Sequence, residues 1–524
     1  MVSKANLSFK SLIAVIALLM LLPLYVSLHD VFNAKNDLSS LLQTRGLGAT
    51  LGRSLLLAFC TGIGGALIAV PQAFFLARYR LPGKKLWVIL FVLPLVVPSY
   101  ISAYSYLAAF GPKGFFEQLF SMPFPIAVSG NLFGTWLSMT LVNCPFIFLM
   151  TYAALLRQSS SIEESAIMLG CSPKKVFFRV TLPNLKIPIA SGTLLVCLYT
   201  LSDFGTPAIL NYKTLTFHIF QYIDLGRFDR ASFFALILIF VAFLFLLAES
   251  FINRRRNSVL DNKTKSSPIM HSTTGLQKTF ILSFFFLTCF VSLIVPFATI
   301  IYWFLQGTSQ FNLSKDLSQV SGNSLLLALL TALIATLFAL PVAWAAIRQK
   351  GLFSKFADRV SFVGNMFPCL VVALAFVSFF ASFKIFGFSL YQTLTLPVLA
   401  CTIRFLPQAV SSIKTSLAQL NPKLEEASLL LGNNKRQTAR QIIEPLIRPG
   451  LLSGFALVFI STLKELPITL VLAQPGKGYL TQRIWDLVDE AEYSRVAAPA
   501  LLLLGISCIS LYFILTKEKS LNDE

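Results

Sequence analysis

The chain has 524 residues, of which 56% are apolar and only 13% are charged, and its mean hydropathy is +0.73. Membrane proteins have this composition, and several apolar runs exceed the roughly 18 residues that cross a bilayer. The composition excludes a sizeable soluble domain. In a soluble protein the net charge of +20 would suggest nucleic-acid binding, but in a membrane protein it first raises the question of which side of the membrane the basic loops face.

About twelve spans of roughly 20 residues each are predicted along the chain. In the first half they lie near residues 10–30, 51–77, 86–110, 130–156, 188–210 and 231–252. In the second half they lie near residues 279–305, 323–347, 360–383, 390–413, 451–473 and 496–516. The first run has no small-residue cleavage site, so we expect a retained span and not a signal peptide. The predicted fold class is an all-α polytopic membrane protein built as two repeated six-helix halves.

A polar segment rich in Ser and Thr, residues 253–278, separates the halves and is predicted to be a flexible linker. If the N-terminus is inside, Lys and Arg are concentrated in the segments on the inner side of the membrane. The positive-inside rule then places both termini, the linker and the two largest loops in the cytoplasm.

The two largest polar loops, residues 163–192 and 425–454, repeat one pattern at a constant offset. The identical pairs are Glu163 and Glu425, Glu164 and Glu426, Leu169 and Leu431, Gly170 and Gly432, Pro183 and Pro445, Ser191 and Ser453, and Gly192 and Gly454. Outside these loops, Pro71 to Arg78 has the same spacing as Pro341 to Arg348. A parallel duplication of a six-span unit explains both matches.

Each repeated loop begins like a capped helix. Ser161 with Glu164 fits a capping box, while Asn421 followed by Pro422 gives an N-cap with proline at the first helical position. Each helix is predicted to end at the glycine of the repeat, in the C′ position. Two short capped helices at equivalent places indicate a paired docking surface.

Twelve-span secondary carriers also have two six-span halves and a central cytoplasmic linker, and composition does not separate them from other transporters. The pair of long cytoplasmic loops with capped helices does separate this chain from such carriers, because a carrier driven by an ion gradient has no evident need for these loops. Two other interpretations stay open: loop helices without a partner, and a membrane scaffold or sensor that transports nothing.

The first copy, Glu164-x-Ala166-x3-Gly170-x9-Val180-x-Leu182-Pro183, resembles the EAA loop of type I ABC importer permeases. The second copy, Glu426-Ala427-x4-Gly432-x9-Ile442-x-Glu444-Pro445, is similar, although Glu444 replaces the usual leucine and Ser165 and Ser428 replace alanines. In that family the loop forms a coupling helix that docks into a groove on an ATPase subunit. The resemblance implies two ATPase subunits bound at coupling loops that include Glu163, Glu164, Ala166, Gly170, Pro183, Glu425, Glu426, Ala427, Gly432 and Pro445.

The resemblance also divides the chain into parts. They are the first transmembrane helix with its outer loop (1–49), a first type I transmembrane domain (50–252), the cytoplasmic linker (253–278), the seventh transmembrane helix with its outer loop (279–319), a second type I transmembrane domain (320–516) and a cytoplasmic tail (517–524).

The chain lacks the GxxxxGK[ST] motif that cradles phosphates, so ATP hydrolysis must come from a separate subunit. Its histidines, His29, His218 and His271, are scattered, and its eight cysteines lie mostly in apolar runs without a CxxC pair. We therefore expect no catalytic residue, no cofactor and no resident metal site.

Asp203 and Glu465 occupy the same repeat position in the fifth and eleventh spans. Intramembrane carboxylates are costly and usually face a protein interior or a wet cavity, so these two residues are candidates for a cation route. They are equally well explained as structural groups, with Glu465 paired to Lys464 or Arg404 and Asp203 accepting a local hydrogen bond. Arg404, inside the tenth span, is a further candidate for the path, although helix packing explains it better.

The phrases SDFGTP, from Ser202, and KELPITLVL, from Lys464, resemble the ferric iron permeases in which both membrane domains are fused in one chain. Related permeases carry thiamine, sulfate or polyamines. The resemblance implies an inner-membrane permease for ferric iron, with thiamine or another small solute as the alternative. Because loops 211–230 and 474–495 each follow a fifth span and mix aromatic with charged residues, they are the expected docking surface for a substrate-binding protein.

Overall fold

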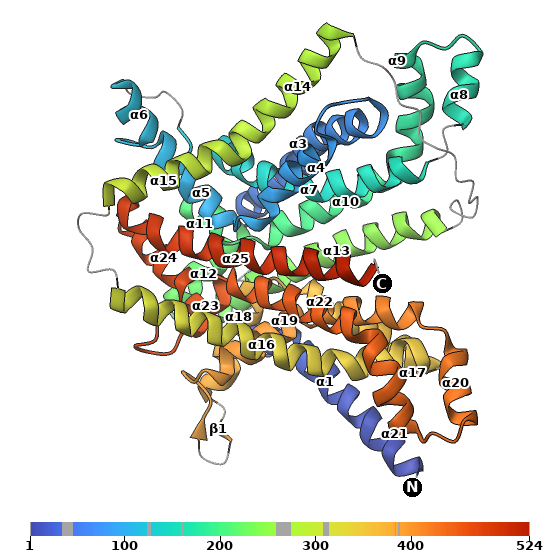
Figure 1. The fold of residues 1–524 in the computed structure, drawn as a ribbon. Helices are drawn as coiled ribbons and strands as arrows, with labels where there is room; N and C mark the ends of the chain where they lie inside the picture. Colours follow the sequence, from blue (N-terminus) through green and yellow to red (C-terminus); the bar gives the residue numbers. More distant parts are fainter. Residues whose placement is uncertain are drawn as a thin grey trace.

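The structure, a computed structural model, describes residues 2–33, 46–122, 127–158, 161–257, 274–307, 314–349, 351–382, 384–385 and 388–522. Long helices run side by side through this part of the chain. Most of the first half of the sequence lies on one side of the molecule and most of the second half lies on the other (Figure 1).

Ten helical segments of the described chain are long and apolar enough to cross a membrane, and two bent helix pairs raise the number to twelve. The predicted all-α class with twelve spans is therefore confirmed. The long helices are α1 (Val2–Phe32), α3 (Leu47–Arg78), α7 (Leu132–Arg157), α10 (Leu182–Ser202), α13 (Phe228–Asn257), α14 (Gly275–Cys289), α15 (Val295–Gly307), α16 (Ser314–Arg348), α19 (Thr395–Gln419), α22 (Glu444–Leu463) and α25 (Tyr493–Asn522). Of the predicted linker, residues 258–273 lie outside the described part.

The third and ninth spans are bent pairs and not the single helices that we predicted near 86–110 and 360–383. In the first pair α4 (Lys84–Val92) and η1 (Leu93–Val96) meet α5 (Ser99–Phe110) and α6 (Phe115–Phe120) at 94°. In the second pair α17 (Leu352–Val363) and η5 (Gly364–Met366) meet α18 (Cys369–Ser382) at 95°. Pro98 and Pro368 stand at the two bends. Proline forces the preceding residue, Val97 or Phe367, into the extended conformation, which ends the helix.

Three π-helical turns interrupt the long helices, and each ends two residues before a proline. They are η2 (Phe177–Thr181) before Pro183, η3 (Phe290–Ile294) before Pro296 and η6 (Ala439–Ile443) before Pro445. A proline ring clashes with the carbonyl four residues earlier, and the wider π turn relieves that clash. Because the helix continues through the π turn, the fifth span runs over Phe177–Ser202 and the eleventh over Arg436–Leu463, earlier than the predicted 188–210 and 451–473.

Short elements connect the spans at both ends. They are α8 (Ser161–Met168), α9 (Pro173–Val176), α11 (Gly205–Ile209), α12 (Leu215–Asp224), α20 (Pro422–Leu430), α21 (Lys435–Thr438), α23 (Pro467–Leu472) and α24 (Leu480–Asp489). The one strand pair in the described chain is antiparallel, β1 (Lys384–Ile385) with β2 (Phe388–Ser389), and places Lys384 opposite Ser389.

The first helix of each half packs against the other half. The seventh span, α14–η3–α15, lies on the first half, where the Phe285 ring is 5.3 Å from Trp87 and 4.9 Å from Phe91 between centroids. In return α1 runs along α17 and α18 of the second half. There the Lys10 ammonium lies 5.6 Å from the centre of the Phe353 ring. Figure 1 shows this exchange, with α14 above the first half and α1 below the second.

The Asp30 side chain joins both halves near the end of α1. Its carboxylate accepts a hydrogen bond from Ser232 of α13 (2.9 Å) and another from Ser378 of α18 (2.7 Å). The halves also meet directly where the centres of the Phe204 and Trp485 rings lie 5.2 Å apart and where the Tyr104 hydroxyl donates to the Tyr493 carbonyl (2.6 Å). One continuous apolar core therefore contains side chains from both halves.

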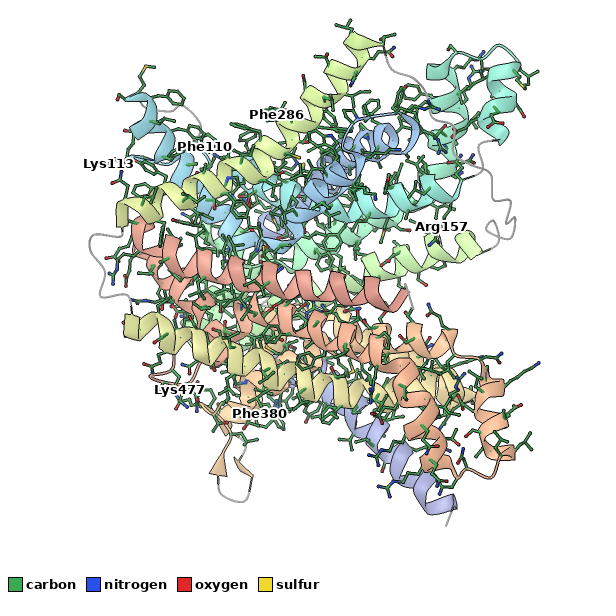
Figure 2. The ribbon with its side chains drawn as sticks, viewed as in Figure 1. Phe110, Lys113, Arg157, Phe286, Phe380 and Lys477 are labelled. Atoms are coloured by element: carbon green, nitrogen blue, oxygen red, sulfur yellow. The ribbon has the colours of Figure 1, made fainter. Side chains whose placement is uncertain are left out.

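Both chain ends and both repeated loops lie at one end of the molecule (Figure 1). Figure 2 shows Arg157, the last residue of α7, at this end, and Lys113 and Lys477 at the opposite end. The elements α6, α12 and α24 lie at that opposite end.

Candidate functional site: the paired loops and the turns between the halves

The repeated loops form two short helices with matching ends, α8 and α20. Each ends in a pair of backbone hydrogen bonds, from Gly170 to Ile167 (2.9 Å) and Cys171 to Ala166 (3.0 Å) in the first copy, and from Gly432 to Leu429 (3.1 Å) and Asn433 to Ser428 (3.2 Å) in the second. These pairs define a Schellman motif, and the two glycines have the left-handed φ values, 80° and 90°, that it requires. The predicted C′ glycines are therefore confirmed.

The N-terminal caps are described only for the second helix. Asn421 is its N-cap, and the Asn421 side chain accepts a hydrogen bond from the Lys423 amide (3.0 Å), with Pro422 at the first helical position as predicted. The predicted capping box depends on the side chain of Ser161, which lies outside the described side chains.

The last turn of each helix presents large apolar side chains to solvent. Met168 and Leu169 are 89% and 84% exposed, and Leu430 and Leu431 are 88% and 84% exposed. Burying such a side chain is favourable by about 1.5–3 kcal/mol, so an exposed cluster of them marks a contact surface for another protein. We call these two pairs of residues the coupling tips.

A buried ion pair anchors the first loop to the end of the second span. Arg78, the last residue of α3, is fully buried, and its Nε and Nη2 atoms lie 3.0 and 3.1 Å from the Glu163 carboxylate oxygens. The Nη1 atom donates to the Leu155 carbonyl of α7 (3.1 Å), and the Thr181 hydroxyl donates to Glu163 (3.0 Å). This one network therefore joins α3, α7, α8 and η2.

The second loop has the same ion pair in a looser form. Arg348, the last residue of α16, lies 2.8 Å from Glu425 and donates to the Leu420 carbonyl (3.2 Å). Its side chain is 14% exposed and that of Glu425 is 20% exposed, against 0% and 4% in the first pair. Ile443 occupies the position of Thr181 and has no hydroxyl to donate.

The second loop has hydrogen bonds within itself instead, which do not involve Glu425. The Ser428 and Thr438 hydroxyls lie 2.9 Å apart, and the Asn433 amide donates to Ser428 (3.2 Å). The first loop has Ala166 in place of Ser428. The first loop is thus fixed to the spans, whereas the second is fixed more to itself.

The two glutamates at the start of each loop face opposite ways. Glu163 and Glu425 turn toward the arginines, while Glu164 and Glu426 are exposed beside the coupling tips. Ala427 is exposed and Ala166 is partly buried. The exposed Pro183 and Pro445 mark the points where the π turns pass into α10 and α22, so the ten predicted residues form two compact loops.

Arg78 and Arg348 are candidate functional residues that the sequence pattern alone did not identify. The signal was present, because the two arginines stand at matching positions after Pro71 and Pro341. A partner for a charged helix end could not be assigned, since the ion pair joins residues far apart in the sequence.

Asp203 follows the last residue of α10, roughly 30 Å along the helix from Pro183. Its carboxylate accepts hydrogen bonds from the Gly205 amide (3.0 Å), the Thr206 hydroxyl (2.9 Å) and the Ser99 hydroxyl. It lies in the turn between α10 and α11 and not inside a span. These are the local hydrogen bonds that a structural role requires.

Glu465 lies in the equivalent turn between α22 and α23. Its carboxylate accepts hydrogen bonds from the Ile468 amide (3.3 Å) and the Cys369 thiol. Arg404 of α19 donates from Nε to the Cys369 sulfur (3.3 Å) and interacts electrostatically with Glu465. Lys464 points elsewhere and donates to the Leu95 carbonyl (3.1 Å).

At the end of the molecule opposite the loops, α12 and α24 occupy equivalent places, within the predicted docking segments 211–230 and 474–495. They line a cavity of about 460 Å³ between the halves, together with α11. Among its lining residues are Phe217, Phe220, Asp224, Trp485 and Asp489.

Burial shifts the pKa values of two side chains on these helices in opposite directions. Burial lowers the pKa of His218, and Lys213 and Arg53 add to this effect, while the hydrogen bond that the His218 ring donates to the Gln221 side-chain oxygen opposes it. Burial raises the pKa of Asp486, against the opposing effect of Arg483. Both shifts favour the uncharged form, which is the form that a desolvated protein contact tolerates.

Comparison with known proteins agrees with this geometry. The family model for the binding-protein-dependent transport system inner membrane component matches residues 65–257 and 335–517, more than half of the chain. The chain is similar to the Fe(3+)-transport system permease protein FbpB 2 of Haemophilus influenzae, with 31% identity over 96% of this chain and 97% of that protein. It is also similar to the ferric transport system permease protein FbpB of Actinobacillus pleuropneumoniae, with 23% identity over 88% of this chain and 70% of that protein.

A shorter match covers 26% of this chain and 46% of the sulfate transport system permease protein CysT of Synechococcus elongatus, at 34% identity. The family model matches both halves, which agrees with the internal duplication. The chain therefore belongs to the inner-membrane components of binding-protein-dependent transport systems, as a multi-pass permease subunit of an ABC importer that is not itself catalytic.

Proposed function

We propose that this permease imports ferric iron, driven by two separate ATPase subunits and supplied by a substrate-binding protein. Support for iron comes from the relatives that match along most of the chain, whose names specify ferric transport. The carboxylates of Asp203 and Glu465 also suit the cargo, because Fe³⁺ is a hard cation that prefers oxygen donors.

One observation carries the coupling mechanism: each coupling tip is connected to the spans through an arginine at the end of a long helix. In the first copy Arg78 links the loop to α3 and α7 at once. A displacement of α8 by a closing ATPase therefore moves these helices together. Glu164 and Glu426, exposed beside the tips, meet the ATPase surface.

The loop end of the molecule faces the cytoplasm in this proposal. Both termini lie at the same end as the loops, and the excess of Lys and Arg in the predicted inner segments favours that side. The binding protein then docks on the opposite end, over α12 and α24, and releases its cargo above the cavity between the halves.

The transport cycle follows from these contacts. ATP closes the two ATPase subunits, the coupling tips approach each other, and the halves open toward the binding protein. The cargo enters between the halves, and hydrolysis restores the inward-facing arrangement.

The test is uptake by vesicles that contain the permease with its ATPase and its binding protein. ATP-dependent uptake of ferric iron, with no uptake of thiamine, is the expected result. Uptake of thiamine without iron would reject iron as the cargo. If a complex that hydrolyses ATP takes up neither solute, both iron and the thiamine alternative are rejected.

A further inference from the structure

We propose that Asp203, Glu465 and Tyr100 form a binding site for a hard cation such as Fe³⁺ between the two halves, and that Arg404 is its resident counter-ion. The inference rests on the proposed function, since a cation importer supplies the ligand for such a site. It goes further by assigning the oxygen donors and by giving the buried arginine a role in transport.

The site is built twice by the internal duplication. Ser99 donates a hydrogen bond to Asp203, and Cys369 donates one to Glu465. Ser99 and Cys369 are the first residues of α5 and α18, directly after the prolines at the two bends. The positive ends of two helix dipoles therefore lie beside the two carboxylates and favour their charged form.

The two turns lie close to each other across the interface between the halves. The Asp203 and Glu465 carboxylates interact electrostatically. A Cβ atom added to Gly205 would meet the Cβ of Tyr100 at 2.7 Å and the side chain of Leu466 at 3.4 Å. The Asp203 turn thus packs against Tyr100 and against the residue that follows Glu465.

The charges at this site do not balance. Among the described residues, Arg404 is the one cation that interacts with Glu465, and the equivalent position of the first half is the apolar Val142. Lys464 is turned toward the Leu95 carbonyl. Arg404 therefore balances the charge of at most one of the two carboxylates, and a second charged carboxylate away from water would favour a bound cation.

Tyr100 supplies an unused oxygen at the same place. Its side chain is only 3% exposed, and its hydroxyl has no hydrogen-bond partner within the described chain. The Glu465 carboxylate lies within electrostatic range of this hydroxyl. Phenol and carboxylate oxygens are both hard donors, so the set of three suits Fe³⁺ better than a soft metal ion.

Arg404 closes the site in this conformation. It reaches Glu465 through the Cys369 thiol and is held by the Gly364 carbonyl (3.1 Å). Among the described residues no three His, Cys, Asp or Glu side chains converge closely enough to hold a metal ion. We therefore assign cation binding to the conformation in which the halves have separated and Arg404 has moved away.

The first test measures ferric iron uptake and ATPase activity in vesicles that contain the complete transporter. Asp203→Asn and Glu465→Gln are each expected to lower uptake about tenfold, as loss of a metal-site group typically does, while ATP hydrolysis stimulated by the loaded binding protein changes less than about twofold. Lys464→Gln is the matched control, because it removes a charge from the same turn that points away from the site, and its uptake should stay within about twofold of wild type.

Substitution of the donors separates a ligand role from a packing role. Tyr100→Phe keeps the ring and should lower uptake about tenfold without a change in the melting temperature of the complex. Cys369→Ser restores the hydroxyl found at Ser99 and should retain uptake, whereas Cys369→Ala should not. Normal iron uptake by both carboxylate variants would overturn the site and leave the proposed function standing.

A binding measurement tests Arg404 directly. The purified complex, held in its ATP-bound state, is incubated with Fe³⁺ and washed, and the retained iron is counted. Arg404→Gln should retain more iron than wild type, and Arg404→Gln combined with Glu465→Gln should lose that gain. Equal retention by wild type and Arg404→Gln would show that the arginine is no counter-ion. If wild type imports thiamine and no iron, the proposed function itself fails.

Discussion

Arg78 and Arg348 end two equivalent helices, yet they differ in how strongly they hold their loops. The first is fully buried and its partner Glu163 has a second donor in Thr181. The second is partly exposed and its loop depends on bonds around Ser428. At the scale of single residues, the two loops are therefore not equivalent, and we expect their proposed contacts with the ATPase to differ.

Arg78→Ala is expected to destabilise the permease by about 3–5 kcal/mol, because it leaves the Glu163 carboxylate buried without a partner. Arg348→Ala, the matched control, should cost less because water reaches the second pair. Thermal unfolding of the purified complex measures both. Arg78→Met with Glu163→Leu should recover most of the loss, and equal losses for the two alanine variants would contradict the asymmetry.

Gly170→Ala tests the backbone at the end of the first coupling helix. Nothing lies within 4 Å of the added Cβ, so the left-handed φ of 80° is the only source of strain, about 1–2 kcal/mol. We expect the loop to change conformation and uptake to fall while ATP hydrolysis persists. Parallel assays of uptake and hydrolysis measure this uncoupling, and Gly322→Ala, with open space and an ordinary φ, is the control. Unchanged uptake would show that the Schellman geometry is not needed.

At the scale of elements, prolines shape the spans. Pro98 and Pro368 turn the third and ninth spans through about a right angle, and three other prolines each follow a π turn. The bends place the N-termini of α5 and α18 beside the carboxylate turns. Segments that a hydropathy profile shows as uniform are thus divided into two arms that meet at about a right angle.

The coupling tips give a prediction at this scale. Met168→Ser with Leu169→Ser should weaken binding of the ATPase without a change in the thermal stability of the permease, because both side chains are already in water. Co-purification of the ATPase measures the effect, and Leu430→Ser with Leu431→Ser tests the second copy. Leu352→Ser, 85% exposed on α17, is the control for loss of a solvated leucine. Undiminished co-purification would exclude the tips as the docking surface.

The elements also show what the sequence could and could not predict. Apolar runs predicted all twelve spans, and the glycine of the repeat predicted the ends of both coupling helices. The bends were missed because hydropathy measures how apolar a segment is and not its direction, although Pro98 and Pro368 were visible. The partner of Glu163 was missed because Arg78 lies on a helix that is distant in the chain, whereas the local hydrogen bonds of Asp203 were among the predicted alternatives.

At the scale of the whole molecule, the exchange of first helices makes each half depend on the other. The α1 helix lies on the second half and α14 lies on the first, and Asp30 bonds to both α13 and α18. No local pattern predicts this exchange, since the sequence of an apolar membrane helix does not indicate which other helix it packs against. The two halves of the chain thus resemble two subunits that have exchanged their first helices.

A chain divided within residues 258–273 should still assemble when both parts are produced together, because the exchanged helices hold the halves. Co-purification of the second part with a tagged first part measures this. The same experiment with α1 deleted is expected to yield little second half. Strong co-purification without α1 would show that the exchange contributes little to assembly.

The central claim is that a separate ATPase drives this passage through the paired coupling tips. Ferric iron uptake by vesicles tests it most directly, with wild type and with both tips replaced by serine, in the presence of the ATPase and the binding protein. We predict that wild type takes up iron only with ATP and that the tip variant takes up none. Uptake driven by a proton or sodium gradient in vesicles that lack the ATPase would contradict the claim.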